Sequence, residues 1–449
     1  MDVRERRRVI AVGEARTNRI RRSRRPEQPD SGPGRDRVVP GLKVASVLAT
    51  TVLILLPAGT AHNLSLLGGH LAVTWSELVT PLLVAHIALM PARSPANIRL
   101  SALSAILGLL AVPAVLSPSL SSALAAFFNF AFGVIAGFAI GYVWTLVPSD
   151  RLNSVDIGVL VSSTIISIQV FAAISGKAND AIHVSAATDL GGSNYLAGIL
   201  AVLALAAYGR LRVVGAPVVA YGLIVIPVAA IVSTLSRGGL VALAVGACVV
   251  LWQDTSHTTW VVPRRMALVA ILFVASYGLA RISAIRGQGI DLNVSTRYAL
   301  FRLAWNGFLS SPLTGQGWAT FRDVTRDSIG EPITFAHNLL LSFLQIGGIL
   351  AVPLLVIIVR WTILAAKHRP EMLPAIAAGI ALAMTDPLLE GFVGGLVMWI
   401  ALYPTSTSGR PGIRALVNYQ RDLGASGGSE SLGAGVTRAP SRRPWPQNS

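Results

Sequence analysis

About twelve runs of apolar residues, each roughly 15 to 25 residues long, alternate along the chain with short polar segments. The runs start near residues 43, 72, 98, 122, 155, 194, 214, 238, 265, 336, 371 and 391. A helix of this length crosses the roughly 30 Å hydrocarbon core of a bilayer. The sequence therefore predicts an all-α, polytopic integral membrane protein with about twelve transmembrane helices over residues 43–404.

Composition agrees with this class. Only 13% of the 449 residues are charged and 53% are hydrophobic, whereas a soluble chain carries about 25% charged residues. The net charge of +16 does not indicate a nucleic-acid partner, because the arginines lie in the tails and short loops, where they set membrane orientation. The one cysteine, Cys248, lies in an apolar run, which excludes a disulfide framework and a thiolate metal cluster.

The two ends of the chain have low-complexity composition. Residues 1–42 contain a dense arginine series and residues 405–449 are rich in Gly, Ser, Pro and Arg, so both are predicted to be disordered cytoplasmic tails. The first tail is too long and too charged to be the start of a cleavable signal, so we expect the first apolar run to be retained. The last two runs are short, and a re-entrant hairpin remains an alternative to two crossings there.

The distribution of positive charge predicts the orientation. With the amino terminus inside, 29 of the 37 lysines and arginines lie on the cytoplasmic side, as the positive-inside rule requires. Six of the eight remaining cations lie between Arg281 and Arg326, at the end of the ninth apolar run and in one long extracytoplasmic loop over about residues 286–335. A seventh, Arg237, lies between two apolar runs. These outer arginines predict a local anionic partner.

The segment "STLSRGGLVAL", residues 233–243, predicts an anion site at the start of an apolar helix. Ser236 is a good N-cap, and Arg237, Gly238 and Gly239 would form the first turn. Free backbone N–H groups, the helix dipole and a guanidinium together suit a phosphate or pyrophosphate. The alternative is an arginine that extends from a helix end toward the membrane surface.

The outer loop contains "NVSTRYALFRLAWNGFLSSPLTGQGWATF", residues 293–321. We expect a helix from Arg297 to about Leu309, capped by Ser295 or Thr296. Its aromatic residues share one stripe bordered by two arginines, namely Tyr298, Phe301, Trp305 and Phe308 between Arg297 and Arg302. Such a helix would lie in the membrane interface, with its aromatic rings toward lipid. A surface helix without chemistry remains the alternative.

The segment "TFAHNLLLSFLQIGG", residues 334–348, places a histidine and an asparagine where the apolar run Leu339–Val359 begins. We expect His337 in the first turn of this helix, with Thr334 as a possible cap. There the positive helix end would favour a neutral imidazole, the form that a general base requires. Asn338 could orient a ligand hydroxyl. A polar pair at a helix end without a catalytic role is the alternative.

Together these motifs resemble the O-antigen ligase and Wzy-type polymerase superfamily of envelope glycosyltransferases. The resemblance rests on three segments, in this order: "SRGGLVAL", "RYALFRLAWNGFLSSPLTGQGWATF" and "HNLLLSFLQIGG". The resemblance implies a GT-C-like helical fold with a large outer loop, in the bacterial cytoplasmic membrane. It implies transfer of a glycan from undecaprenyl pyrophosphate to an acceptor hydroxyl, with no cofactor, no nucleotide sugar and no metal.

By motif position, the resemblance implies that Arg237 and Arg297 engage the pyrophosphate and that His337 is the base. Arg286, Arg302, Asn338, Gly238 and Ser236 are the further substrate-binding candidates. The long arginine-rich tails depart from the family pattern, and they leave the acceptor undetermined.

Two other classes are compatible with the composition. A transporter or lipid flippase would place charges near the bilayer midplane, whereas most candidate charges here lie at the outer rim; the Gly-rich segment 131–142 fits close helix packing as well. The other alternative is a scaffold without chemistry. The acids of the outer side, Asp323, Asp327, Glu331, Asp386 and Glu390, are expected to be solvated or paired with Arg322 and Arg326 rather than to bind a metal.

Overall fold

In the computed structural model, the described residues are 40–58, 60–66, 69–90, 95–147, 151–175, 193–253, 277, 278, 280, 290–330, 332–386, 388 and 391–403. The chain divides into two units, Met1–Lys43 and Val44–Ser449. Of the first unit only residues 40–43 are described, and they begin α2. The contacts discussed below lie within the second unit. Most of both predicted tails and Arg286 lie outside the described residues.

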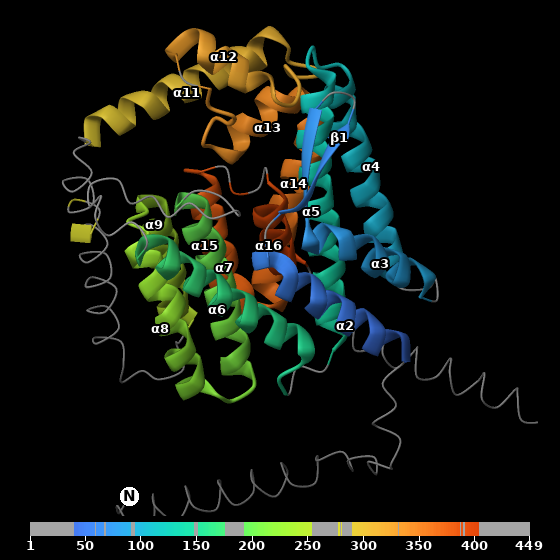
Figure 1. Cartoon of the computed structure of the whole chain (residues 1–449), viewed down its shortest axis with the longest axis vertical. Coiled ribbons are helices and arrows are strands. Elements are labelled where there is room, and N and C mark those ends of the chain that lie inside the picture. The colour runs from blue at the N-terminus through green and yellow to red at the C-terminus, as the bar shows by residue number, and fades with distance from the viewer. Residues whose placement is uncertain are drawn as a thin grey trace, which may run out of the picture. The chain divides into compact units, whose positions relative to one another are not determined.

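The described chain is almost entirely helical (Figure 1). Its first part contains α2 (Pro40–Leu55), η1 (Leu56–Ala58), β1 (Thr60–Leu66), β2 (Gly69–Thr74), α3 (Trp75–Leu89), α4 (Pro95–Val115), α5 (Leu120–Leu146), α6 (Ser154–Ser175), α7 (Ser193–Val213), α8 (Pro217–Ser233) and α9 (Arg237–Gln253). Its second part contains α11 (Ile290–Ser310), α12 (Thr320–Ile329), α13 (Leu339–Gly347), η3 (Gly348–Ala351), α14 (Val352–His368), η4 (Pro370–Met372), α15 (Leu373–Ala383) and α16 (Phe392–Leu402).

Helices begin near the predicted starts of the apolar runs, except that the run near residue 265 lies outside the described residues. Within the described ranges, five helical segments are long and apolar enough to cross a membrane, namely Gly41–Ala58, Leu120–Leu146, Ser154–Ser175, Asn194–Val213 and Leu339–His368. The prediction of a polytopic, helical membrane protein is therefore confirmed. The antiparallel hairpin β1–β2 was not predicted and is an exception to the all-α class.

Helix α7 lies at the centre of the helix packing. It contacts α6, α8, α9, α15 and α16, and 89% of its most apolar stretch is buried within the protein. Small side chains let helices approach closely in a membrane. The same principle acts between α5 and α16, because a Cβ added to Gly133 or Gly137 would lie 2.4 Å from a main-chain oxygen of α16. The glycines of segment 131–142 therefore serve helix packing.

Trp318 fastens the segment between α11 and α13 to the helices beneath it. Its side chain is fully buried, and its indole N–H donates to the Leu110 carbonyl of α4 at 3.0 Å. The ring packs against Phe130 of α5 and Phe343 of α13, with centroids 5.3 Å and 6.4 Å away. A buried aromatic ring with a satisfied polar atom is a strong local anchor.

The apolar run that begins at Leu339 is not one continuous helix. Helix α13 ends at Gly347, and Gly348 has a φ of 54°. The Gln345 carbonyl accepts from the Gln316 N–H at 2.8 Å, and the Ile349 N–H donates to the Pro312 carbonyl at 2.9 Å. At the break, the backbone groups that leave the helix form hydrogen bonds with the loop before α12. Gly348 allows the break because glycine adopts a positive φ without steric cost.

The predicted helix of the outer loop is longer than expected. Helix α11 begins at Ile290, so Ser295 and Thr296 lie inside it and do not cap it. One side of α11, with Leu300 and Ala304, packs against Phe321 and Ala336. Figure 1 shows α11, α12 and α13 grouped together, in agreement with their mutual contacts. Helix α12 itself was not predicted.

Candidate active site

The carboxylate of Asp386 is the centre of a polar cluster. Asp386 lies in the turn after α15, and its side chain is only 3% exposed. Its Oδ1 atom accepts from the Nδ2 atom of Asn194 at 3.1 Å and lies 3.3 Å from the Nδ1 atom of His337. Its Oδ2 atom lies 4.0 Å from a terminal nitrogen of Arg297. A buried carboxylate is stable only with such polar partners.

The start of α9 also faces this carboxylate. Ser236 is the N-cap, as predicted, because its Oγ atom accepts from the Gly239 N–H at 2.9 Å; it also donates to the Oδ1 atom of Asn194 at 2.8 Å. A Cβ added to Gly238 would lie 2.3 Å from the Oδ2 atom of Asp386. The anion at this helix start is therefore the protein's own carboxylate, which the helix dipole favours.

The structure corrects the predicted position of His337. The first residue of α13 is Leu339, and its N-cap is Asn338, whose side-chain oxygen accepts from the Leu341 N–H at 3.1 Å. His337 therefore precedes the helix, and Thr334 does not cap it. The Asn338 amide also donates to the Met384 carbonyl at 3.4 Å. This contact ties the start of α13 to the residues just before Asp386.

One member of the cluster, His337, and one residue next to it, Leu235, have strained backbone conformations. His337 has a φ of 54° and Leu235, next to Ser236, has a φ of 51°. A non-glycine residue in this left-handed region costs on the order of 1–3 kcal/mol and persists only where the surroundings hold it. Such strain concentrates at functional sites. Here it turns His337 out of the helical path and brings its imidazole to Asp386.

The predicted arginines separate into three groups. Arg297 reaches the cluster and keeps 31% of its side chain exposed, so it can still bind a ligand. Arg237 is half-buried at the first position of α9, one residue before Gly238. Arg302 is exposed on α11, but five residues after Arg297 it points about 140° away from it around the helix. It is not brought to Asp386 by the packing.

The pairing of His337 with Asp386 suits proton transfer. As a carboxylate, Asp386 can only accept hydrogen bonds, so the Nδ1 atom of His337 is the donor. In a neutral imidazole the Nε2 atom then carries the lone pair and can act as a base. The His337 side chain is 28% exposed, so a reactant can approach it. This is the arrangement of a base oriented by a third group.

Sequence reasoning missed Asp386 and Asn194. Asp386 was expected to be solvated or paired with Arg322 or Arg326, and this expectation is wrong. It lies 49 residues from His337 along the chain, and no local spacing connects the two. Asp323 does pair with Arg326, at 3.7 Å, as expected. Glu331 and Glu390 lie outside the described residues.

A comparison with protein-family models gives a match over residues 222–356, to a family described as O-Antigen ligase. This part of the chain is similar to O-antigen ligases. The resemblance inferred from the three motifs is thereby confirmed. No curated protein matches the chain.

The matched region runs from α8 into α14 and contains Arg237, Arg297 and His337. Asn194 and Asp386 lie outside the matched residues. The cluster is therefore assembled from the matched region and from two further helices, α7 and the end of α15. Its completion depends on how the rest of the chain packs around this region.

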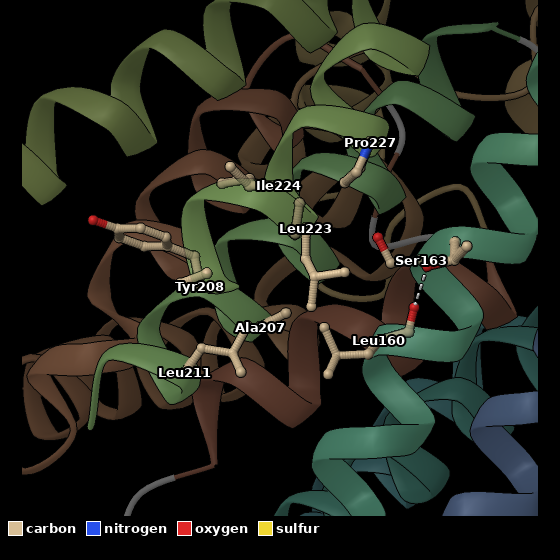
Figure 2. Close-up of a pocket in the computed structure, with 11 residues that line it drawn as sticks. Leu160, Ser163, Ala207, Tyr208, Leu211, Leu223, Ile224 and Pro227 are labelled. Carbon is tan, nitrogen blue, oxygen red and sulfur yellow. Dashed lines mark hydrogen bonds between the residues drawn. The ribbon is translucent and has the colours of Figure 1, made fainter. Parts of the chain in front are cut away.

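A small cavity lies away from this cluster, between α6, α7 and α8 (Figure 2). Leu160, Tyr208 and Leu223 line it, together with Ser163. Its volume is about 10 Å³, which is room for about one water molecule, so it is not a substrate site. Among the residues placed by the structure, no group of three His, Cys, Asp or Glu side chains is arranged to hold a metal.

Proposed function

We propose that the protein transfers a glycan from undecaprenyl pyrophosphate to an acceptor hydroxyl, as an O-antigen ligase or a polysaccharide polymerase. The observation that carries this proposal is the cluster of His337, Asp386 and Arg297, built around the region similar to O-antigen ligases. A base paired with a carboxylate and an adjacent guanidinium supplies proton removal and anion binding in one place.

The proposed step is a substitution at the anomeric carbon of the donor glycan. The acceptor oxygen forms a bond to this carbon as the bond to the pyrophosphate oxygen breaks. The hydroxyl proton moves to the Nε2 atom of His337, and undecaprenyl pyrophosphate leaves with the electron pair. Asp386 stabilises the imidazolium that forms. The step needs no nucleotide sugar and no metal, so activity should persist in excess chelator.

Arg297 and Arg237 are proposed to hold the pyrophosphate. Guanidinium groups suit phosphate oxygens because they can donate two parallel hydrogen bonds. Arg286 and Arg302 are proposed as contacts with the lipid-linked donor outside the Asp386 cluster. Ser236 and Gly238 act on the donor indirectly in this scheme, because their observed contacts hold Asn194 and Asp386 in place. Asn338 likewise sets the position of His337 through the α13 cap.

The cluster is proposed to face the extracytoplasmic side of a bacterial cytoplasmic membrane. Asn194 lies in the first turn of α7, while Arg210 and Arg212 lie in its last turn, about 24 Å away at the helical rise per residue. This distance approaches the hydrocarbon thickness. Positive charge at the far end of α7 supports a cytoplasmic location there. Both termini inside, about twelve crossings and a GT-C-like arrangement complete the proposal.

The test is single substitution of the three proposed catalytic residues. His337→Ala, Arg237→Ala and Arg297→Ala should each reduce transfer from a polyprenyl-pyrophosphate-linked glycan by at least 100-fold, a loss typical of a general base or charge-stabilising group. Arg322→Ala is the matched control, because Arg322 is exposed on α12, and it should retain activity. Membrane insertion is measured in parallel by fractionation. Normal turnover in the three variants would refute the mechanism.

Deletion of the gene distinguishes the possible acceptors. Single repeat units accumulating on the lipid carrier would indicate a polymerase, and full-length chains on the carrier would indicate a ligase. Unchanged glycans together with altered uptake of small molecules would favour a transporter instead.

A further inference from the structure

One side of α11 carries large aromatic side chains that are exposed or half-buried, whereas a neighbouring side of the helix is buried. We define this aromatic face as Tyr298, Phe301, Trp305 and Phe308, with Leu309 beside them. Tyr298 is 69% exposed, Trp305 46% and Leu309 56%. Leu300 and Ala304, on the neighbouring side of the helix, are buried with Phe321 of α12 and Ala336. Phe301 and Phe308 are half-buried, so it is Tyr298, Trp305 and Leu309 that leave most of their apolar surface outside the protein core.

A second exposed apolar surface runs along α14. Its members recur every three or four residues on one side of the helix, and they are 39–62% exposed: Val352, Val356, Val359 and Ile363. Helix α14 belongs to Leu339–His368, one of the segments that can cross a membrane. A continuous apolar stripe on such a helix is typical of contact with lipid chains.

The two surfaces meet. The chain after α11 reaches Pro312, whose carbonyl accepts from the Ile349 N–H at 2.9 Å. Leu313 is 69% exposed and Ile349 is 54% exposed, so the apolar exposure continues from the end of α11 to the start of α14. The exposed apolar side of α14 therefore continues toward the aromatic face of α11.

We propose that the aromatic face of α11 lies in the membrane interface, at the surface where α14 enters the bilayer. The occupant of this face is the lipid bilayer itself. Aromatic rings favour the boundary between headgroups and hydrocarbon. Arg302 is exposed beside the aromatic face, where its guanidinium can contact lipid phosphates. Arg297 is on the same helix, so this placement also puts Arg297 at the depth of the lipid headgroups. A lipid-linked diphosphate would present its charge at that depth, a point that rests on the proposed function.

Spin labels on α11 test the placement without any assay of activity. The Cys248→Ala variant removes the one cysteine of the chain, and Trp305→Cys or Asn306→Cys is added to it. The two positions are adjacent, both are exposed, and they point about 100° apart around the helix. The labelled full-length protein is reconstituted in vesicles of phosphatidylcholine and phosphatidylglycerol. Collisions with oxygen, which enters lipid, and with a water-soluble nickel chelate are then measured by electron paramagnetic resonance.

The label at position 305 should collide several-fold more with oxygen, relative to nickel, than the label at position 306. Tyr298→Cys, on the aromatic face, should behave like position 305, and it provides a second reading if the loss of Trp305 disturbs the fold. Equal ratios at the three positions would overturn the proposal. Protection from both reagents, with spin–spin broadening that disappears on dilution with lipid, would also overturn it by assigning the face to a second copy of the chain.

Discussion

At the scale of the residue, the structure places a carboxylate, Asp386, beside the predicted histidine, His337. His337, Arg297 and Arg237 were identified by residue type and by their place at the ends of apolar runs. The proposed base, His337, has Asp386 beside it only because the turn after α15 comes back to the start of α13. Asp386 can act on His337 through its negative charge and through its hydrogen-bonding position. Substitution by asparagine removes the charge and keeps the shape of the side chain.

We expect Asp386→Asn to reduce turnover by about 100-fold or more while leaving donor affinity within a few-fold, because the loss of charge affects the imidazolium formed during the reaction. The amide can still accept from Asn194, so the local fold should persist. Turnover and Michaelis constants measured on purified protein provide the check. If turnover remains at the level of the unmodified protein, Asp386 does not orient the base.

At the scale of the element, the site depends on a short segment that carries no catalytic group. Residues 311–319 join α11 to α12, and they pair with the end of α13 through backbone hydrogen bonds. Trp318 secures the segment to α4 and α5. The sequence indicated a break here from Pro312 and its neighbouring glycines, but it gave no partner for the tryptophan. That partner lies more than 200 residues earlier in the chain.

Trp318→Ala should therefore destabilise the protein by about 3–5 kcal/mol, the usual cost of removing a large buried aromatic side chain. The expected readouts are a lower unfolding temperature in detergent and faster proteolysis within residues 311–335. Trp252→Ala removes the same side chain from an exposed position, where Trp252 is 74% exposed. An equal effect of both substitutions would contradict the anchoring role of Trp318.

At the scale of the whole molecule, two buried polar clusters lie at the two ends of α7. The second cluster centres on Asp156, whose Oδ1 atom accepts from the Nε atom of Arg210 at 2.9 Å and from the Trp144 indole at 2.6 Å. Arg369 lies over the Trp144 ring at 5.3 Å. A buried ion pair is costly to break because it leaves an uncompensated charge. This cluster therefore joins α5, α6, α7 and the end of α14.

Asp156→Ala should cost about 3–5 kcal/mol of stability, since it leaves Arg210 buried without its carboxylate. The double variant Asp156→Leu with Arg210→Leu should recover much of that loss, because both charges are then removed. Unfolding temperatures give the comparison. The transfer rate per folded molecule should not change, since the Asp386 cluster lies at the other end of α7. A selective loss of turnover at unchanged stability would contradict this separation.

The sequence by itself determined the class of the molecule, the positions of most helices and the residue types that carry the proposed chemistry. These follow from local properties, namely the length of apolar runs, the types of the residues at their ends and the cap at Ser236. It did not determine the start of α11, the break at Gly348 or the α13 cap at Asn338, because each depends on contacts with distant segments. Asp386 is the clearest case: a lone carboxylate after an apolar run has no local signature, and only the packing of α7, α9, α11, α13 and α15 gives it its partners.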